Sequence, residues 1–138
     1  MSTVRHKPEG YPSVVPYLVV TNADALMRFL AKTFGAHEIM RDKRPDGTIW
    51  HAQVRIDDAV IMLSDANAEN PAMPGLIYVF VPDCDAAFAR AVAAGAEPVM
   101  EPTDMEYGDR NAGVRDASGI MWWIATRRRA EGYDAEAG

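Results

Sequence analysis

The chain has 138 residues, of which 49% are hydrophobic and 25% are charged. These values are typical of a single globular domain that buries its own core. The net charge of −6 excludes nucleic acid as a partner, because nucleic-acid-binding proteins usually carry a basic face. The N-terminus has no apolar core of signal-peptide length, and no stretch is long enough to span a membrane. We therefore expect a cytoplasmic protein that binds neither nucleic acid nor membrane.

The first part of the chain predicts an arm, a strand and a helix. Residues 1–12 are rich in proline and glycine and should form an extended arm. Ser13–Val20 is apolar and β-rich, which predicts a strand. The apolar spacing of Ala23–Phe34 predicts a helix, with Asn22 as its N-cap. Gly35 follows, where a left-handed residue commonly ends a helix.

Three strands are predicted next, over His37–Arg44, Thr48–Ile56 and Ala59–Ser64. The dipeptide Asp46-Gly47 between the first two is a strong signal for a tight hairpin. The polar, proline-containing segment 65–75 reads as a linker. Residues 13–64 therefore form one strand–helix–strand–strand–strand module.

The chain then repeats this plan, because Tyr78–Met100 resembles Tyr17–Met40 once one residue is deleted. Tyr17 matches Tyr78, and Gly35 matches Gly95. The second module, residues 76–126, is predicted to have the strand Leu76–Val81, the N-cap Asp83, the helix Asp85–Ala94, and the strands Glu97–Met100, Asn111–Asp116 and Met121–Thr126.

Two segments of the second half depart from the repeat. Residues 101–110 replace the short hairpin turn and are expected to form a long polar loop, of the kind that often builds specificity. Residues 127–138 are expected to be a solvated strand end and a frayed tail. The predicted fold class is α+β, with two tandem βαβββ modules.

Cys84 is the only cysteine, so the chain cannot form an internal disulfide. It lies on the apolar stripe of the second predicted helix, four residues before Phe88. We expect a buried structural thiol, since a reactive cysteine needs an exposed and electropositive setting.

Short motifs occur in both modules: Pro16-Tyr17-Leu18, Phe34-Gly35-Ala36, Asp46-Gly47, His51-Ala52, Val81–Asp85, Ala94-Gly95-Ala96, Tyr107-Gly108-Asp109-Arg110, Asp116–Gly119 and Trp122. In these residues the sequence resembles the vicinal oxygen chelate superfamily, which includes glyoxalase I, bleomycin-resistance proteins, fosfomycin-resistance enzymes and extradiol dioxygenases. The likeness is to its PhnB-like branch. It implies that the modules curl into a cup-like mixed sheet with the helices outside, and that the protein is a homodimer, with modules exchanged between chains in some members.

The resemblance also implies metal ligands on the first and last strands of each module. The corresponding residues here are Val15, Met62, Leu76 and Trp123. Three of these side chains have no donor atom for a divalent cation, and a thioether is a poor ligand for such an ion. We therefore expect a cup without a metal or other cofactor.

Strand alternation predicts which side chains face this cup. In Thr48–Ile56 it assigns Trp50, Ala52, Val54 and Ile56 to the helix side, and Ile49, His51, Gln53 and Arg55 to the cup. Trp122 and Trp123 are adjacent, so one of them should be core. The candidate ligand-binding residues are Tyr17, His51, Gln53, Met62, Tyr78, Phe80, Arg110 and Trp123. Tyr17 and Tyr78 also fit a role in the core.

Three functions are consistent with this pattern. The first is binding of a small planar or aromatic molecule in an apolar cup. The second is a metal-independent enzyme that uses His51 as the catalytic acid–base group on a carbonyl or phenol-like substrate. A metal-dependent lyase or dioxygenase ranks third. His51 also fits a structural role as a hydrogen-bond partner of a neighbouring strand.

Overall fold

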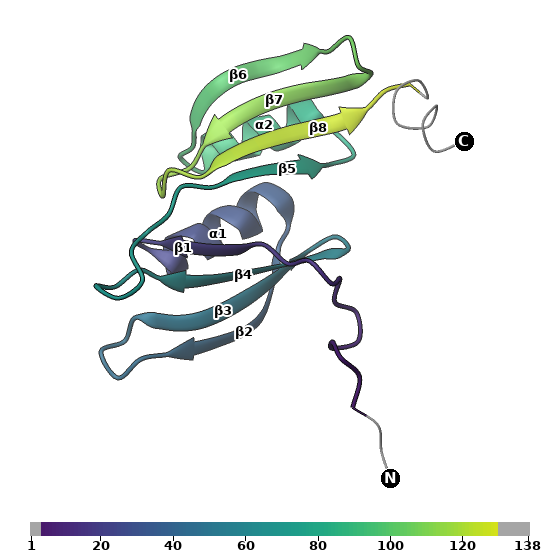
Figure 1. Ribbon diagram of the computed structural model, residues 1–138. Helices are drawn as coiled ribbons and strands as arrows, with labels where there is room; N and C mark the ends of the chain where they lie inside the picture. The colour runs from purple at the N-terminus through teal and green to yellow at the C-terminus, as the bar shows by residue number, and fades with distance from the viewer. Residues whose placement is uncertain (1–3, 130–138) are drawn as a thin grey trace.

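The computed structural model describes residues 4–129, and within them it has eight strands and two helices. The predicted α+β fold of two tandem modules is confirmed (Figure 1). The first module consists of β1 (Tyr17–Val20), α1 (Ala23–Phe34), β2 (His37–Lys43), β3 (Ile49–Ile56) and β4 (Ala59–Asp65). The second consists of β5 (Leu76–Phe80), α2 (Cys84–Ala93), β6 (Glu97–Asp104), β7 (Asp109–Arg115) and β8 (Met121–Arg127). The tail predicted at Glu131–Gly138 lies outside the described residues.

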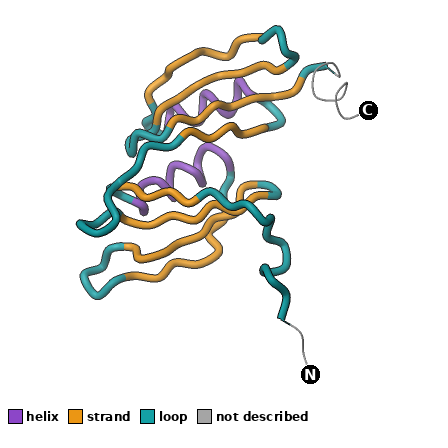
Figure 2. Tube along the Cα trace, in the orientation of Figure 1, coloured by secondary structure: helices purple, strands orange, loops and turns teal. Residues whose placement is uncertain are grey.

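Each module forms a four-stranded mixed sheet, in the order β1-β4-β3-β2 or β5-β8-β7-β6. The pairs β1–β4 and β5–β8 are parallel, and the remaining pairs are antiparallel. Figures 1 and 2 show β1 and β5 next to each other at the middle of the molecule, with both helices behind the sheets. We call the sheet face opposite the helices the open face. Neither helix of residues 4–129 has the length and apolarity to cross a bilayer.

The local signals at the helix ends act as predicted. Asn22 Oδ1 accepts a hydrogen bond from the backbone N–H of Ala25, at 3.1 Å, and Asp83 Oδ1 accepts one from Ala86, also at 3.1 Å. Gly35 has a φ of 68°, a left-handed conformation that glycine adopts without steric cost. The two N-cap bonds satisfy backbone N–H groups that have no partner within the helix.

Trp122 joins the two modules in one core. It belongs to β8 and is fully buried, with its ring 6.5 Å from that of Phe29 and 5.4 Å from that of Phe34, both in α1. Its indole Nε1 donates to Asp116 Oδ2 at 2.7 Å, which satisfies the buried N–H. The helices also pack on each other, and Arg90 Nε donates to the backbone oxygen of Thr33 at 3.0 Å.

The prediction for Trp50 was wrong. Ala52, Val54 and Ile56 are buried on the helix side as predicted, but the Trp50 side chain is 60% exposed and Ile49 is buried in its place. The cause is a bulge: His51 pairs with Asp42 and Ile49 with Lys43, so Trp50 has no partner in β2. One extra residue reverses the alternation before His51 and turns Trp50 to the open face.

The predicted long loop over residues 101–110 was also wrong. β6 continues to Asp104 and β7 begins at Asp109, which leaves only a tight turn. Met105 N–H donates to the Asp109 oxygen at 2.8 Å, and Gly108 N–H donates to the Met105 oxygen at 3.1 Å. Because β6 is an edge strand, it tolerates proline and polar residues that read as loop signals in the sequence.

Cys84 is buried as predicted, and its Sγ donates to the Ile124 oxygen at 3.2 Å. Burial, with a smaller effect of Asp85, raises the pKa of the Cys84 thiol to about 11. At pH 8 only about 0.1% of this thiol would be ionised. We expect Ellman's reagent to react slowly with the folded protein at pH 8 and rapidly in denaturant. Rapid stoichiometric reaction with the folded protein would contradict this placement.

Candidate binding face

The strand register brings the predicted site residues into two equivalent rows on the open face. Tyr17 pairs with Met62, which pairs with Gln53. In the second module Tyr78 pairs with Trp123, which pairs with Gly113. Each row runs across its sheet from the strand nearest the other module. The repeat therefore places the first-strand tyrosine of each module at the centre of the molecule.

Three of the predicted residues form a connected group in the first module. The Tyr17 hydroxyl lies 3.1 Å from His51 Nδ1, and Gln53 Nε2 lies 2.9 Å from His51 Nε2. Both ring nitrogens of His51 thus have a side-chain partner. The phenol of Tyr11 in the N-terminal arm donates to Gln53 Oε1.

Tyr11 is a site residue that the sequence did not reveal. The Arg55 guanidinium carbon lies 5.9 Å from the centre of the Tyr11 ring, and Arg55 Nη1 donates to the Gly10 oxygen at 3.3 Å. These contacts fasten the arm to the open face of the first module. Nothing in the proline- and glycine-rich segment itself indicates where it docks.

A polar hollow of about 340 Å³ lies beside this group. Trp50 reaches it because of the bulge in β3. Its lining consists of Tyr17, Arg44, Trp50, His51, Ser64, Asn67, Glu69 and Asn70. The Tyr17 and Trp50 rings therefore meet charged and hydrogen-bonding groups in one place.

The second module contributes an aromatic pair and a buried acid. The Tyr78 and Phe80 ring centres are 5.3 Å apart. The Tyr78 hydroxyl donates to Asp109 Oδ2 at 2.5 Å, and Asp109 is 1% exposed. Burial and, next, the bond to Asp109 raise the pKa of Tyr78 above its ordinary value of 10. Nothing in the sequence indicated this pair.

Trp123 lies on the open face over Gly113. A Cβ atom at position 113 would come within 2.6 Å of the Trp123 ring, closer than side chains pack. Glycine at this position thus provides the space that the indole occupies. A small residue opposite a large aromatic on the next strand is the signal by which Gly113 could have been found.

Arg110 is separated from the other candidates. It points to the helix side, where its Nε lies 2.7 Å from Asp85 Oδ1 in α2 and its Nη1 lies 2.9 Å from Asp104 Oδ1. The bonds to Asp85 and Asp104 raise the pKa of Arg110 above its ordinary value. Since neighbouring residues of a strand face opposite sides, Arg110 points away from the side that Asp109 occupies. We do not retain Arg110 in the candidate site.

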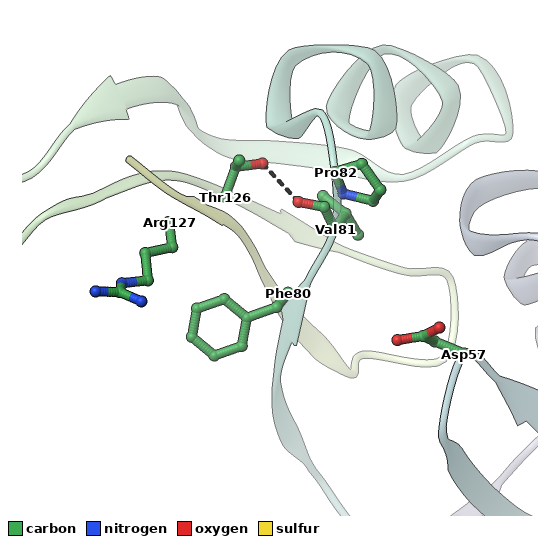
Figure 3. A pocket seen from close by; sticks show the side chains of 6 residues that line it. All are labelled: Asp57, Phe80, Val81, Pro82, Thr126 and Arg127. Atoms are coloured by element: carbon green, nitrogen blue, oxygen red, sulfur yellow. Dashed lines mark hydrogen bonds between the residues drawn. The ribbon is translucent and has the colours of Figure 1, made fainter. Parts of the chain in front are cut away.

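A second hollow, of about 560 Å³, opens at the ends of β5 and β8 (Figure 3). Phe80 is 52% exposed and forms its apolar wall, and Thr126 Oγ1 donates to the Val81 oxygen at 2.7 Å. Asp57, from the turn between β3 and β4, lies on the opposite side from Arg127 in this view. The two modules thus line this hollow together.

The residues at the implied metal positions do not fit a divalent cation. Met62 and Trp123 lie in register with Tyr17 and Tyr78, and Val15 and Leu76 precede those tyrosines by two residues. Within residues 4–129 no three His, Cys, Asp or Glu side chains are grouped closely enough to hold a metal. The donor groups on this face include the Tyr17 and Tyr78 phenols, the His51 imidazole, the Gln53 amide and the Asp109 carboxylate.

Known proteins resemble this chain in sequence. The family model of the Glyoxalase/Bleomycin resistance protein/Dioxygenase superfamily matches residues 11–124. The uncharacterized protein Mb0911c of Mycobacterium bovis is 36% identical over 134 residues, which cover 89% of this chain and 88% of that protein.

Two solved structures share the fold. TioX from Micromonospora sp. ML1 superposes with a TM-score of 0.70 at 28% identity, over 82% of this chain and 96% of that one. TnmS3 from Streptomyces sp. CB03234, described as an antibiotic binding protein, superposes with a TM-score of 0.60 at 23% identity, over 84% and 97% of the two chains.

Proposed function

The chain belongs to the glyoxalase/bleomycin resistance protein/dioxygenase superfamily, and from this premise we propose that it binds a small, planar or aromatic molecule on its open face without a metal ion. The observation that carries the proposal is a set of exposed aromatic side chains on this face. Tyr17 is 48% exposed, Tyr78 38% and Phe80 52%. Large apolar groups gathered on one surface commonly mark a binding site.

The chemistry of these groups supports a planar ligand. Aromatic side chains bind flat molecules by offset stacking or edge-to-face contact, and Trp123 adds an indole in the same row as Tyr78. His51 and Gln53 supply polar groups that can orient a ligand beside these aromatic side chains. TnmS3, which shares the fold, is described as an antibiotic binding protein, and this supports binding of a small molecule.

Absence of a metal is part of the proposal. It is supported by the side chains at Val15, Met62, Leu76 and Trp123, since hard and borderline cations need oxygen, nitrogen or thiolate donors. Ligand affinity should therefore be the same in the presence of EDTA and in the presence of zinc or nickel.

We also propose that the protein is a homodimer. Leu76 and Phe80 leave more than half of their side chains exposed in the single chain, at 64% and 52%, and an apolar surface of this kind is commonly covered by a partner. Sedimentation equilibrium is the test. A species of twice the chain mass is expected, and a monomer at every concentration would contradict the proposal.

The binding function is tested by a thermal-unfolding screen of planar aromatic antibiotics and metabolites. A ligand present at a hundred times its dissociation constant adds about 2.7 kcal/mol to the free energy of unfolding. We expect at least one such compound to raise the unfolding temperature equally with and without EDTA. The proposal would be contradicted if no compound of a broad library raised the unfolding temperature, or if EDTA abolished every such rise.

A further inference from the structure

We propose that a directed chain of hydrogen bonds makes the Tyr17 hydroxyl the donor to the ligand, which therefore presents an acceptor oxygen at this point. This series of hydrogen bonds runs from Tyr11 through Gln53 and His51 to Tyr17, and we call it the relay. The ligand part of this inference rests on the proposed binding function. The direction of the relay belongs to the protein alone.

The first step concerns the Gln53 amide. Tyr11 donates to its Oε1, so the amide nitrogen is turned toward His51, at 2.9 Å from the ring Nε2. An amide nitrogen donates hydrogen bonds and does not accept them. His51 Nε2 must then be the unprotonated, accepting nitrogen of the ring.

The second step concerns the His51 proton. A neutral imidazole whose Nε2 is unprotonated carries its proton on Nδ1. His51 Nδ1 lies 3.1 Å from the Tyr17 oxygen and therefore donates to it. A hydroxyl that accepts this bond directs its own hydrogen elsewhere. Tyr17 thus has a hydrogen to donate to a third group.

The third step concerns where that hydrogen points. Tyr17 is 48% exposed and lines the hollow of about 340 Å³ together with Trp50 and Arg44. Arg44 Nη1 and Nη2 bind Thr48 Oγ1 and the backbone oxygen of Asp65, which holds the guanidinium at the wall. A carbonyl or carboxylate oxygen on an aromatic ligand would meet the Tyr17 hydroxyl and the Arg44 charge, although Glu69 adds one negative charge to the lining.

The relay assigns different roles to its members. Tyr17 contacts the ligand, whereas His51, Gln53 and Tyr11 are positioning residues that orient its hydroxyl. Arg55 holds Tyr11 in place through the ring contact and the bond to Gly10. The N-terminal arm is therefore part of the site, although it lies outside the repeated modules.

The direction of the relay is tested without any ligand. In the full chain at pH 8, the ¹⁵N resonances of the His51 ring distinguish a protonated nitrogen from an unprotonated one. We expect the Nδ1–H form. Tyr11→Phe keeps the ring beside Arg55 but removes the donor to Gln53, so the share of this form should fall. His6 and His37 are internal controls. An Nε2–H form of His51 in the unaltered chain would overturn the inference.

The donor role is tested with two probes that share one ring system, 2-naphthoate and 2-naphthylmethylammonium. Tyr17→Phe removes only the hydroxyl, and we expect it to weaken 2-naphthoate binding about tenfold while leaving the ammonium probe unchanged. The ammonium probe is the matched control, because it has the same ring system but offers no acceptor oxygen to the Tyr17 hydroxyl.

The outcomes separate this inference from the proposed function. Equal affinity of the Tyr17→Phe variant and the unaltered chain for 2-naphthoate would overturn the donor role and leave aromatic binding intact. Binding of neither probe would count against both the binding function and the donor role. The His51 spectrum would still decide the direction of the relay.

Discussion

Replacing Trp122 with alanine is expected to lower the free energy of unfolding by about 4 kcal/mol. The indole is fully buried in β8 and packs against Phe29 and Phe34 of the other module, so its removal leaves a cavity where the modules meet. Asp116 would also lose the indole N–H that it accepts at 2.7 Å. Urea denaturation followed by circular dichroism measures the change.

A second variant keeps this prediction testable if the alanine protein does not fold. Trp122→Phe retains an aromatic ring but removes the donor to Asp116, and it should cost about 2 kcal/mol. Asp116 would keep its bonds from the backbone N–H groups of Ser118 and Ile120. A loss below about 1 kcal/mol for Trp122→Ala would show that the modules are held together by other contacts.

Replacing Trp123 with alanine is expected to affect ligand binding more than stability. Its side chain is half-buried on the open face against Gly113, so its loss should lower stability less than Trp122→Ala does and should weaken ligand binding about thirtyfold, the effect typical of a central aromatic contact. Isothermal titration with a compound selected in the thermal screen measures the affinity. The neighbouring variant Trp122→Phe serves as control, with lower stability and unchanged affinity.

Gly113→Ala tests the same contact without removing the indole. A methyl group there would sit 2.6 Å from the present ring position, so Trp123 would have to move. We expect lower affinity for the same compound in this variant as well. Unchanged affinity in both Trp123→Ala and Gly113→Ala would place the ligand away from this row.

The fold was largely predictable because its signals are local and occur twice. Asn22 and Asp83 cap the helices as predicted, and Gly35 ends the first one. Trp50 was not predictable, because a bulge depends on pairing with the neighbouring strand and leaves no mark in the alternation of one strand. The extent of β6 was hidden for a related reason, since an edge strand need not alternate.

The candidate site was predictable only in part. Alternation correctly grouped His51 with Gln53, and the structure adds Tyr17 through a hydrogen bond. Tyr11 could not be found, since the contact between the arm and Gln53 joins segments far apart in the chain. Arg110 was predicted to contact the ligand because of its place in a motif, whereas its guanidinium forms ion pairs with Asp85 and Asp104.

The most direct test of the binding face uses the three tryptophans as probes, since the chain contains only Trp50, Trp122 and Trp123. Each gives one indole ¹H–¹⁵N resonance, and a compound from the thermal screen is titrated into the protein. We predict that the Trp123 resonance shifts while that of Trp122, buried and bonded to Asp116, stays in place. A bound compound that leaves Trp50 and Trp123 unmoved would contradict an aromatic ligand site on the open face.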